Sequence, residues 1–212
     1  MLNLVKLPVR KSDVALRVSK GHFVTSHSHI NYYIDVTFQK SRLSEARATA
    51  KALAKQYVNT LVVDTILCLD GMQVVGTCLA DELTRSGFMS INAHKTIYVI
   101  TPETTGQSQL LFRDNLQPML RGKHVLVLMA SATTGITASR SMECVGYYGG
   151  TVVGISAIYS AIEKTESGMP INALFRVSDL PDYASHSPHN CPMCRQGEKI
   201  DALVTGNGYS TL

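Results

Sequence analysis

Residues that could bind an anion follow directly after the apolar stretch HVLVLM at positions 124–129. The set comprises Ser131, Ala132, Thr133, Thr134, Gly135 and Thr137. A turn of this kind between a buried strand and a helix presents unpaired backbone N–H groups at the helix N-terminus, where the helix dipole also favours negative charge. We therefore predict that this loop binds a phosphate. Capping of the helix by the same Ser and Thr residues is the alternative interpretation.

A second set of candidate ligands lies near the C-terminus, where His186, His189, Cys191 and Cys194 form the pattern H-x2-H-x-C-x2-C. Thiolates and imidazoles are preferred ligands of Zn²⁺, so these residues are candidates for a structural Zn²⁺ site. A single Cys-x2-Cys pair is only half of a usual zinc site, whose second pair tends to lie far away in the sequence. Surface histidines beside reduced, partly buried cysteines are the commoner alternative.

Length and composition narrow the classes of protein to consider. The chain has 212 residues, of which 45% are hydrophobic and 17% charged, which indicates a single globular domain. Apolar runs are too short for a membrane span, and the scattered Lys and Arg residues do not form the basic stripe typical of nucleic-acid binding. Five cysteines are an odd number, which favours reduced thiols, and the N-terminal stretch lacks the order of a secretory signal. We therefore expect a cytoplasmic protein that binds neither membranes nor nucleic acid.

The hydrophobic pattern predicts alternating strands and helices. Residues 21–39 should form a hairpin, and an amphipathic helix is expected within 41–61, capped by Ser41 or Ser44. Further strands are expected at 65–69, 96–100, 124–129 and 151–159, with helices at 74–85, ending near Gly87, and from the Thr-Thr-Gly turn to about 148. Continuously apolar strands that alternate with helices indicate an α/β fold with a doubly wound, mainly parallel sheet.

The chain is predicted to contain one α/β domain at 1–180. Its N-terminal segment, residues 1–40, is called the hood. The tail at 181–212 is rich in Pro, His and Gly and poor in apolar runs. We expect it to be irregular and to pack on the domain.

Three stretches in the same order along the chain carry a resemblance to a known family. The strand, TTGIT loop, helix and following strand TVVGISAIY resemble the type I phosphoribosyltransferases. The stretch GHFVTSHSHINYYID resembles the opening of orotate phosphoribosyltransferase, and the tail CPMCRQGEKIDAL resembles the ending of some of its members. The resemblance implies a type I phosphoribosyltransferase fold.

The resemblance also implies a function. The loop at 131–137 would hold the 5′-phosphate of phosphoribosyl pyrophosphate or of a nucleotide. Further ligand contacts would come from Asp70, Gly71, Tyr33 and Arg113. A homodimer is implied as well, because in orotate-type enzymes a mobile loop reaches the neighbouring active site.

The sequence departs from the family pattern at the residues that carry the chemistry. Met129 and Ala130 stand where the family has an acidic pair beside the ribose and the Mg²⁺-bound substrate, so the cofactor Mg²⁺ would lack those ligands. Ile100 and Thr101 stand where orotate enzymes carry Arg-Lys, and Ser28 stands near an expected glycine, with His27 and His29 beside it. The expected function is therefore binding of a ribose 5-phosphate compound with weak or no transferase activity.

Two alternatives stay open. The first is an active phosphoribosyltransferase for orotate or a related base, in which Asp70, Glu143 or Arg113 supplies the missing groups. The second is a structural or assembly partner that has kept only the fold.

Overall fold

The computed structural model describes residues 2–7, 14–85, 90–93, 96–105, 109–180 and 182–212. Within these ranges the centre of the molecule is a five-stranded parallel sheet with the strand order β10-β9-β8-β4-β5. The strands are β4 (Thr65–Cys68), β5 (Tyr98–Ile100), β8 (His124–Ala132), β9 (Thr151–Ser160) and β10 (Ile171–Arg176). Both faces of β4 are buried, as expected for a continuously apolar strand in a parallel sheet.

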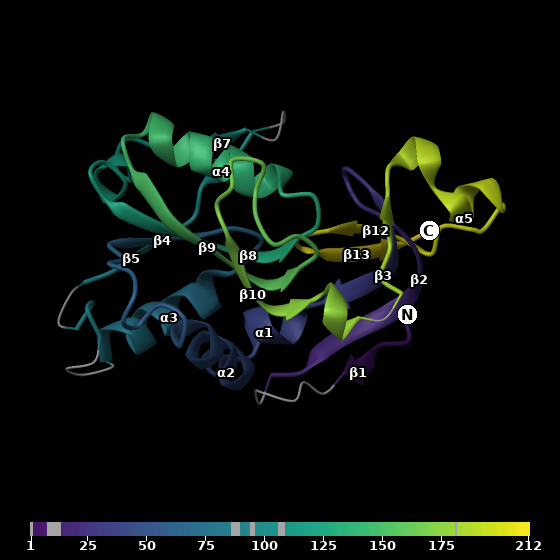
Figure 1. The fold of residues 1–212 in the computed structure, drawn as a ribbon, viewed down its shortest axis with the longest axis horizontal. Coiled ribbons are helices and arrows are strands. Elements are labelled where there is room, and N and C mark those ends of the chain that lie inside the picture. The colour runs from purple at the N-terminus through teal and green to yellow at the C-terminus, as the bar shows by residue number, and fades with distance from the viewer. Residues whose placement is uncertain (1, 8–13, 86–89, 94–95, 106–108, 181) are drawn as a thin grey trace.

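Helices cover both faces of this sheet (Figure 1). The helices α1 (Thr37–Ser41), α2 (Leu43–Ala54) and α3 (Gln73–Arg85) lie on one face, and α4 (Ile136–Tyr147) lies on the other. Alternate residues of β8 therefore enter different cores: Leu128 packs with the α2–α3 side and Val127 with the α4 side. This arrangement confirms the predicted doubly wound α/β fold.

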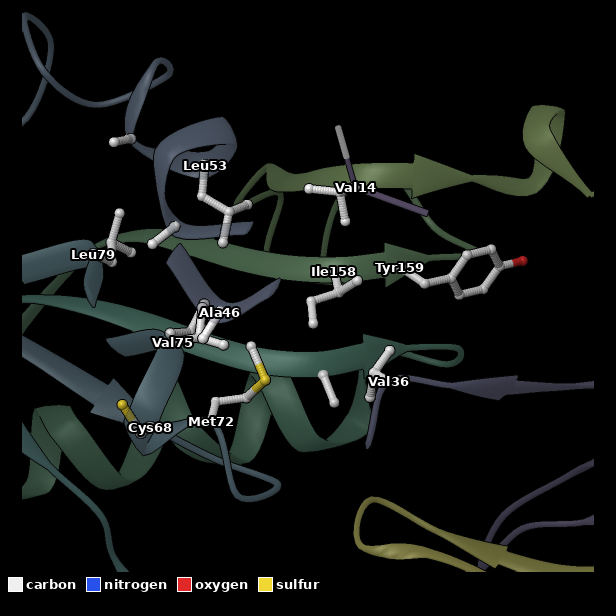
Figure 2. Packing of buried hydrophobic residues seen from close by; sticks show 14 of the residues in the cluster. Val14, Val36, Ala46, Leu53, Cys68, Met72, Val75, Leu79, Ile158 and Tyr159 are labelled. Atoms are coloured by element: carbon white, nitrogen blue, oxygen red, sulfur yellow. The ribbon is translucent and has the colours of Figure 1, made fainter. Parts of the chain in front are cut away.

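The α2–α3 core shows how the amphipathic helices are held. Figure 2 shows Ala46 and Leu53 of α2 and Val75 and Leu79 of α3 beside the sheet, near Ile158 of β9. These helical residues are fully buried. Burying large aliphatic side chains stabilises the fold by about 1.5–3 kcal/mol each, so this core fixes the position of the sheet edge from which the site is built.

A second sheet forms the hood and draws strands from both ends of the chain. Its order is β11-β3-β2-β12-β13, with β1 also paired to β2. The strands are β1 (Val5–Leu7), β2 (Leu16–Val24), β3 (His29–Asp35), β11 (Ser185–His186), β12 (Ala202–Thr205) and β13 (Gly208–Thr211). In Figure 1 the yellow C-terminal strands run beside the purple and blue N-terminal strands.

The tail beyond 181 is more regular than the sequence suggested. Residues Ala202 and Leu203 of β12 pair in parallel with Phe23 and Val24 of β2, and β12 and β13 form a hairpin. The stretch Thr205-Gly-Asn-Gly208 supplies the turn, a strong hairpin signal that the short flanking strands obscured. The tail thus packs on the rest of the chain by completing a sheet.

Shorter elements connect the main ones. A small antiparallel pair follows β5, formed by β6 (Glu103–Thr104) and β7 (Leu110–Leu111). Short helices occur at Gln117–Met119, Val177–Asp179 and Pro188–Asn190 (all 3-10) and at α5 (Pro192–Arg195). No helix in the described part of the chain has the length and apolar character needed to cross a membrane.

Three apolar residues, Leu110, Leu111 and Phe112, follow β6, and they differ in burial. Phe112 is only 1% exposed, and its ring meets the Tyr148 ring edge-on with centroids 5.4 Å apart. Phe112 therefore belongs to the α4 core, whereas Leu110 and Leu111 are half-buried.

The predicted helix at 41–61 is correct in place but not in its ends. It begins at Leu43 after the N-cap residue Arg42, and no side chain caps it. Ser41 does not cap it because its hydroxyl donates to the Thr37 carbonyl inside α1, a helix that the sequence did not indicate. Regular helix ends at Ala54, and a series of turns carries the buried Tyr57. The expected end of the next helix near Gly87 lies outside the described residues.

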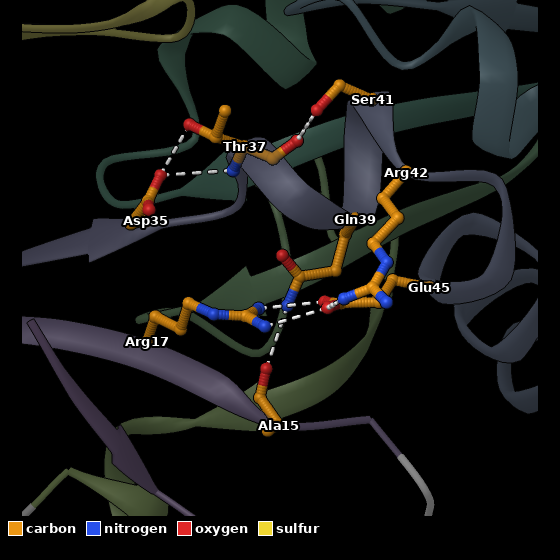
Figure 3. Close-up of polar contacts among 8 residues, drawn as sticks. All are labelled: Ala15, Arg17, Asp35, Thr37, Gln39, Ser41, Arg42 and Glu45. Atoms are coloured by element: carbon orange, nitrogen blue, oxygen red, sulfur yellow. Dashed lines mark hydrogen bonds and ion pairs between the residues drawn. The ribbon is translucent and has the colours of Figure 1, made fainter.

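A partly buried ion pair joins the hood to α2. Both Nη atoms of Arg17 in β2 donate to the Glu45 carboxylate at 2.7 Å (Figure 3). The Arg17 guanidinium also lies 4.3 Å from the centre of the Phe38 ring. The Arg17 side chain is 8% exposed. Hydrogen bonds from Arg17 are the main cause that lowers the pKa of Glu45.

We expect Glu45→Gln to lower the free energy of unfolding by about 3 kcal/mol at pH 7, because it leaves the Arg17 charge buried without its partner. Since the pKa of Glu45 is lowered by folding, its contribution is complete above the unfolded-state pKa of about 4.3 and disappears as the pH falls through the folded-state value. Urea unfolding from pH 7 to pH 3 measures both effects.

The matched control is Glu103→Gln, which breaks the exposed pair between Glu103 and Arg113. This variant should leave the free energy of unfolding almost unchanged, because an exposed ion pair is screened by water and salt. An equal loss in the two variants would show that burial of the Arg17 pair has no special effect.

Candidate functional site

The predicted phosphate loop lies between β8 and α4, at the carboxyl edge of the parallel sheet. Strand β8 continues through Ser131 to Ala132, and α4 begins at Ile136. Gly135 is the N-cap residue, with a φ of 80° that favours glycine, and a Cβ added to it would lie 2.7 Å from Ile162 Cδ1. The tight turn therefore requires glycine at this position.

No side chain caps α4, although Thr133 and Thr134 directly precede its N-cap. This observation disfavours the interpretation in which the loop hydroxyls serve only as helix caps. The first N–H groups of α4 and the threonine hydroxyls remain available to a ligand. Such an arrangement binds anions through the unpaired amides and the helix dipole together.

The loop forms one wall of a cavity of about 140 Å³. The opposite walls come from the β2–β3 turn, which supplies Ser26 and His27, and from the β12–β13 turn near Gly206. All the predicted loop residues line this cavity, as do Tyr33 and Asp70. The hood therefore covers the phosphate loop with segments from both ends of the chain.

Lys40 is a cavity residue that the sequence did not reveal. Its ammonium group donates to the Asp70 carbonyl at 2.9 Å and to the Gly206 carbonyl at 2.6 Å. Burial lowers its pKa, while the Asp70 carboxylate acts in the opposite direction. Lys40 thus ties α1, the turn after β4 and the β12–β13 turn together, and it places a cation beside the phosphate loop.

Asp70 and Gly71 form a sharp turn after β4, since both have positive φ angles of 51° and 76°. The Asp70 carboxylate accepts a hydrogen bond of 3.2 Å from the Ala130 N–H, and burial raises its pKa. Asp70 therefore lies against the strand position where the family has its acidic pair. Among the described residues that line this cavity and the next, Asp70 alone carries a carboxylate.

A second cavity of about 430 Å³ adjoins the first and shares His27, Asp70 and Thr137 with it. Gly71, Thr101 and Arg140 are among its other lining residues. The buried Thr101 hydroxyl has no hydrogen-bond partner, and Arg140 is an exposed cation one helical turn after Thr137. Arg140 could have been predicted from this spacing, because residues three apart share a helix face.

Of the residues proposed to replace the missing catalytic groups, Asp70 lines the cavities, whereas Arg113 and Glu143 do not. Arg113 lines neither cavity and is paired with Glu103 through its Nε and Nη2 atoms, at 2.7–3.0 Å. Glu143 also lines neither cavity. Tyr33 lines the first cavity, but its hydroxyl donates to Asp35 and burial raises its pKa. Asp64 lies at the opposite end of the sheet, where its carboxylate accepts from the His124 N–H and lies 2.9 Å from His124 Nδ1.

The three departures from the family pattern have clear structural consequences. Met129 and Ala130 are 1% and 2% exposed, so they belong to the packed strand. Ile100 is also buried, at 5% exposure. Ser28 closes the hood turn, where its carbonyl accepts the Thr25 N–H, and this turn directs Ser26 and His27 toward both cavities.

The candidate zinc ligands meet different histidines from those expected. Cys191 and Cys194 lie with His22 and His29, and His186 and His189 are not part of this group. The short Pro188–Asn190 helix carries His189 into solvent, while the Cys191–Cys194 turn faces the β2–β3 hairpin. The second ligand pair thus lies far away in the sequence, as is usual for structural zinc sites.

Comparison with known proteins supports the resemblance deduced from the loop. No known protein-family profile matches the sequence. An orotate phosphoribosyltransferase of Carboxydothermus hydrogenoformans is 27% identical over 203 residues, covering 94% of this chain and 95% of the relative. The solved phosphoribosyltransferase of Corynebacterium diphtheriae has a TM-score of 0.53 over 77% of this chain and 90% of its own, at 19% identity.

The chain has the type I phosphoribosyltransferase fold. The orotate phosphoribosyltransferase of Mycobacterium tuberculosis, solved in complex with phosphoribosyl pyrophosphate, has the same fold, with a TM-score of 0.50 and 16% identity over 70% of this chain and 82% of that one. The similarity to the orotate phosphoribosyltransferase of Carboxydothermus hydrogenoformans extends over most of this phosphoribosyltransferase-like chain.

Proposed function

We propose that this protein binds a ribose 5-phosphate compound, either a nucleotide or phosphoribosyl pyrophosphate, and has weak or no phosphoribosyl transfer activity. The observation that carries the proposal is the uncapped N-terminus of α4, which faces a covered cavity beside Lys40. A phosphate there would accept hydrogen bonds from backbone amides and threonine hydroxyls. The adjoining cavity leaves space for the remainder of the ligand.

The weak activity follows from the groups that surround the reacting carbon in this fold. Transfer of the phosphoribosyl group develops positive charge on the sugar and negative charge on the leaving pyrophosphate. Met129 and Ala130 are apolar and buried, so they offer neither a carboxylate for the sugar nor a ligand for Mg²⁺. Ile100 and Thr101 carry no charge for the pyrophosphate.

An active enzyme is the second candidate function, and two observations favour it. Asp70 is a carboxylate against Ala130, and Arg140 is a cation in the second cavity. In such an enzyme Asp70 would stabilise the sugar cation, and Arg140 would neutralise pyrophosphate, with orotate or a related base as acceptor. Burial raises the pKa of Asp70, which disfavours the charged form that this role requires.

We also propose a homodimer, as in the orotate-type enzymes that the chain resembles. The half-buried Leu110 and Leu111 of β7 remain available for such a contact. A structural partner that has kept only the fold would need neither the uncapped loop nor the polar cavity.

Calorimetric titration tests the proposed binding. We expect ribose 5-phosphate, nucleoside monophosphates and phosphoribosyl pyrophosphate to bind, and ribose without phosphate to show no heat beyond dilution. The phosphate supplies most of the affinity because charge-assisted hydrogen bonds contribute about 1.5–3 kcal/mol each. Equal binding of ribose and ribose 5-phosphate, or binding of neither, would exclude the proposed ligand class.

A further inference from the structure

Four metal-ligating side chains from opposite ends of the chain converge beside the hood sheet. His22 in β2 and His29 in β3 meet Cys191, the N-cap residue of α5, and Cys194, which lies within α5. One ligating atom from each residue lies within 4.8 Å of the other three. The β2–β3 hairpin and the Cys-Pro-Met-Cys turn thus supply two ligands each, which is how structural zinc sites are usually assembled.

The distances fit the edges of a tetrahedron around one small ion. With Zn–N near 2.1 Å and Zn–S near 2.3 Å, tetrahedral geometry requires N···S edges of about 3.6 Å and an N···N edge of about 3.4 Å. His22 Nε2 lies 3.7 Å from Cys191 Sγ and 3.6 Å from Cys194 Sγ. His29 Nδ1 lies 3.2 Å from Cys194 Sγ and 3.0 Å from His22 Nε2. The two distances from His22 match these edges, and the two from His29 are about 0.4 Å shorter, so a small outward shift of the His29 ring would complete the geometry.

A second contact orients the His22 ring. Its Nδ1 lies 3.1 Å from the Glu198 carbonyl, which can only accept, so Nδ1 carries the proton. The Nε2 lone pair therefore points at the group, where His29 and both cysteines surround it. Metal-bound histidines in proteins are generally held in this way through their second nitrogen. A cation at the centre of the group could accept this lone pair together with those of His29 and the two cysteines.

Burial and charge favour a divalent ion with two thiolates. His22, His29 and Cys191 are buried, at 2%, 8% and 1% exposure, whereas Cys194 is exposed and leaves a route for the metal. Two thiolates cancel the charge of Zn²⁺, so no net charge is buried. Gly197, with a φ of 72°, ends the α5 turn and brings the Glu198 carbonyl to His22.

We propose that His22, His29, Cys191 and Cys194 bind one structural Zn²⁺ ion that joins the hood hairpin to the C-terminal tail. Four protein ligands fill a tetrahedron, so the ion takes no part in catalysis. The two segments that it joins lead directly into walls of the first cavity, through Ser26 and His27 on one side and Gly206 on the other. Zinc would therefore hold the cover over the phosphate loop. This inference does not depend on the ligand that the cavity binds.

Elemental analysis of the untagged protein, purified in reducing buffer without chelators, tests the proposal. We expect one zinc per chain, and Co²⁺ substitution should give the absorption bands of a tetrahedral site with thiolate ligands. Removing the ion should lower the unfolding midpoint by about 10 °C, and added Zn²⁺ should restore it. Hydrogen exchange at residues 22–29 should become faster in the metal-free protein.

Matched serine variants locate the site. Cys194→Ser should lose more than nine-tenths of the bound zinc, and because Cys194 is exposed the variant should still fold. Cys78→Ser replaces a half-buried cysteine of α3 outside the group and should keep one zinc per chain. Wild-type protein that neither contains zinc nor takes it up after reduction would overturn the proposal, as would a Cys194→Ser variant with full zinc content.

Discussion

Replacing Thr133 by alanine and Gly135 by valine should reduce the affinity for ribose 5-phosphate at least about 100-fold, since two or more charge-assisted hydrogen bonds are lost. The alanine removes a loop hydroxyl that faces the cavity. The valine strains a backbone with a φ of 80° and collides with Ile162, so the amides at the start of α4 turn away from the ligand. Calorimetric titration of the variant measures the loss.

The control for this prediction is Thr151→Ala with Gly168→Val. Thr151 is an exposed residue of β9, and Gly168 has a φ of 86° with no atom within 4 Å of an added Cβ. This pair reproduces the backbone strain away from the cavities, so it should bind ribose 5-phosphate as the natural protein does. If both double variants lost affinity equally, the effect would come from general destabilisation and the loop would not be the phosphate site.

Met129→Asp combined with Ala130→Asp should raise phosphoribosyl transfer about 100-fold above that of the natural chain, because carboxylates return to the place where positive charge develops. The substitutions also put two charges at positions that are 1% and 2% exposed. We therefore expect a lower free energy of unfolding, partly recovered when Mg²⁺ and phosphoribosyl pyrophosphate bind. Release of pyrophosphate with orotate as acceptor measures the activity.

The isosteric variant Met129→Asn with Ala130→Asn separates charge from shape. The asparagine variant should lose less free energy of unfolding than the aspartate variant, because it buries no charge, and it should show no gain in activity. Substantial turnover by the natural protein, followed by a decrease in the aspartate variant, would contradict the proposal and support an active enzyme with Asp70 in the catalytic role.

The central fold could be predicted from the sequence because its elements are locally encoded. The strands β4 and β8 consist mainly of consecutive apolar residues, and α3 has helical spacing from Gln73 to Arg85. The hood could be predicted only in part. The pairing of β12 with β2 joins residues about 180 positions apart, and the four-residue β12 carries no periodicity long enough to indicate it.

The candidate site also contains residues that the sequence could predict and residues that it could not. The candidate phosphate loop is a continuous stretch, so its place between a strand and a helix could be predicted from residue types alone. Lys40 could not be predicted, because its role depends on carbonyls of Asp70 and Gly206 that only folding brings together. The cysteine pair was visible, but His22 is 169 positions from Cys191. Histidines next to the cysteines in the sequence were therefore a poorer guide than the hairpin that packs on them.

The most direct test of the central claim is the dependence of phosphoribosyl pyrophosphate binding on Mg²⁺, measured by calorimetry in metal-free buffer and again with millimolar Mg²⁺. If the loop binds the 5′-phosphate while the groups for the chemistry are absent, the two affinities should agree within about threefold, since no acidic pair holds the metal against the substrate. Binding that requires Mg²⁺ would contradict the claim. In that case other residues, with Asp70 first, would hold the metal-bound substrate, and the protein would be an active transferase.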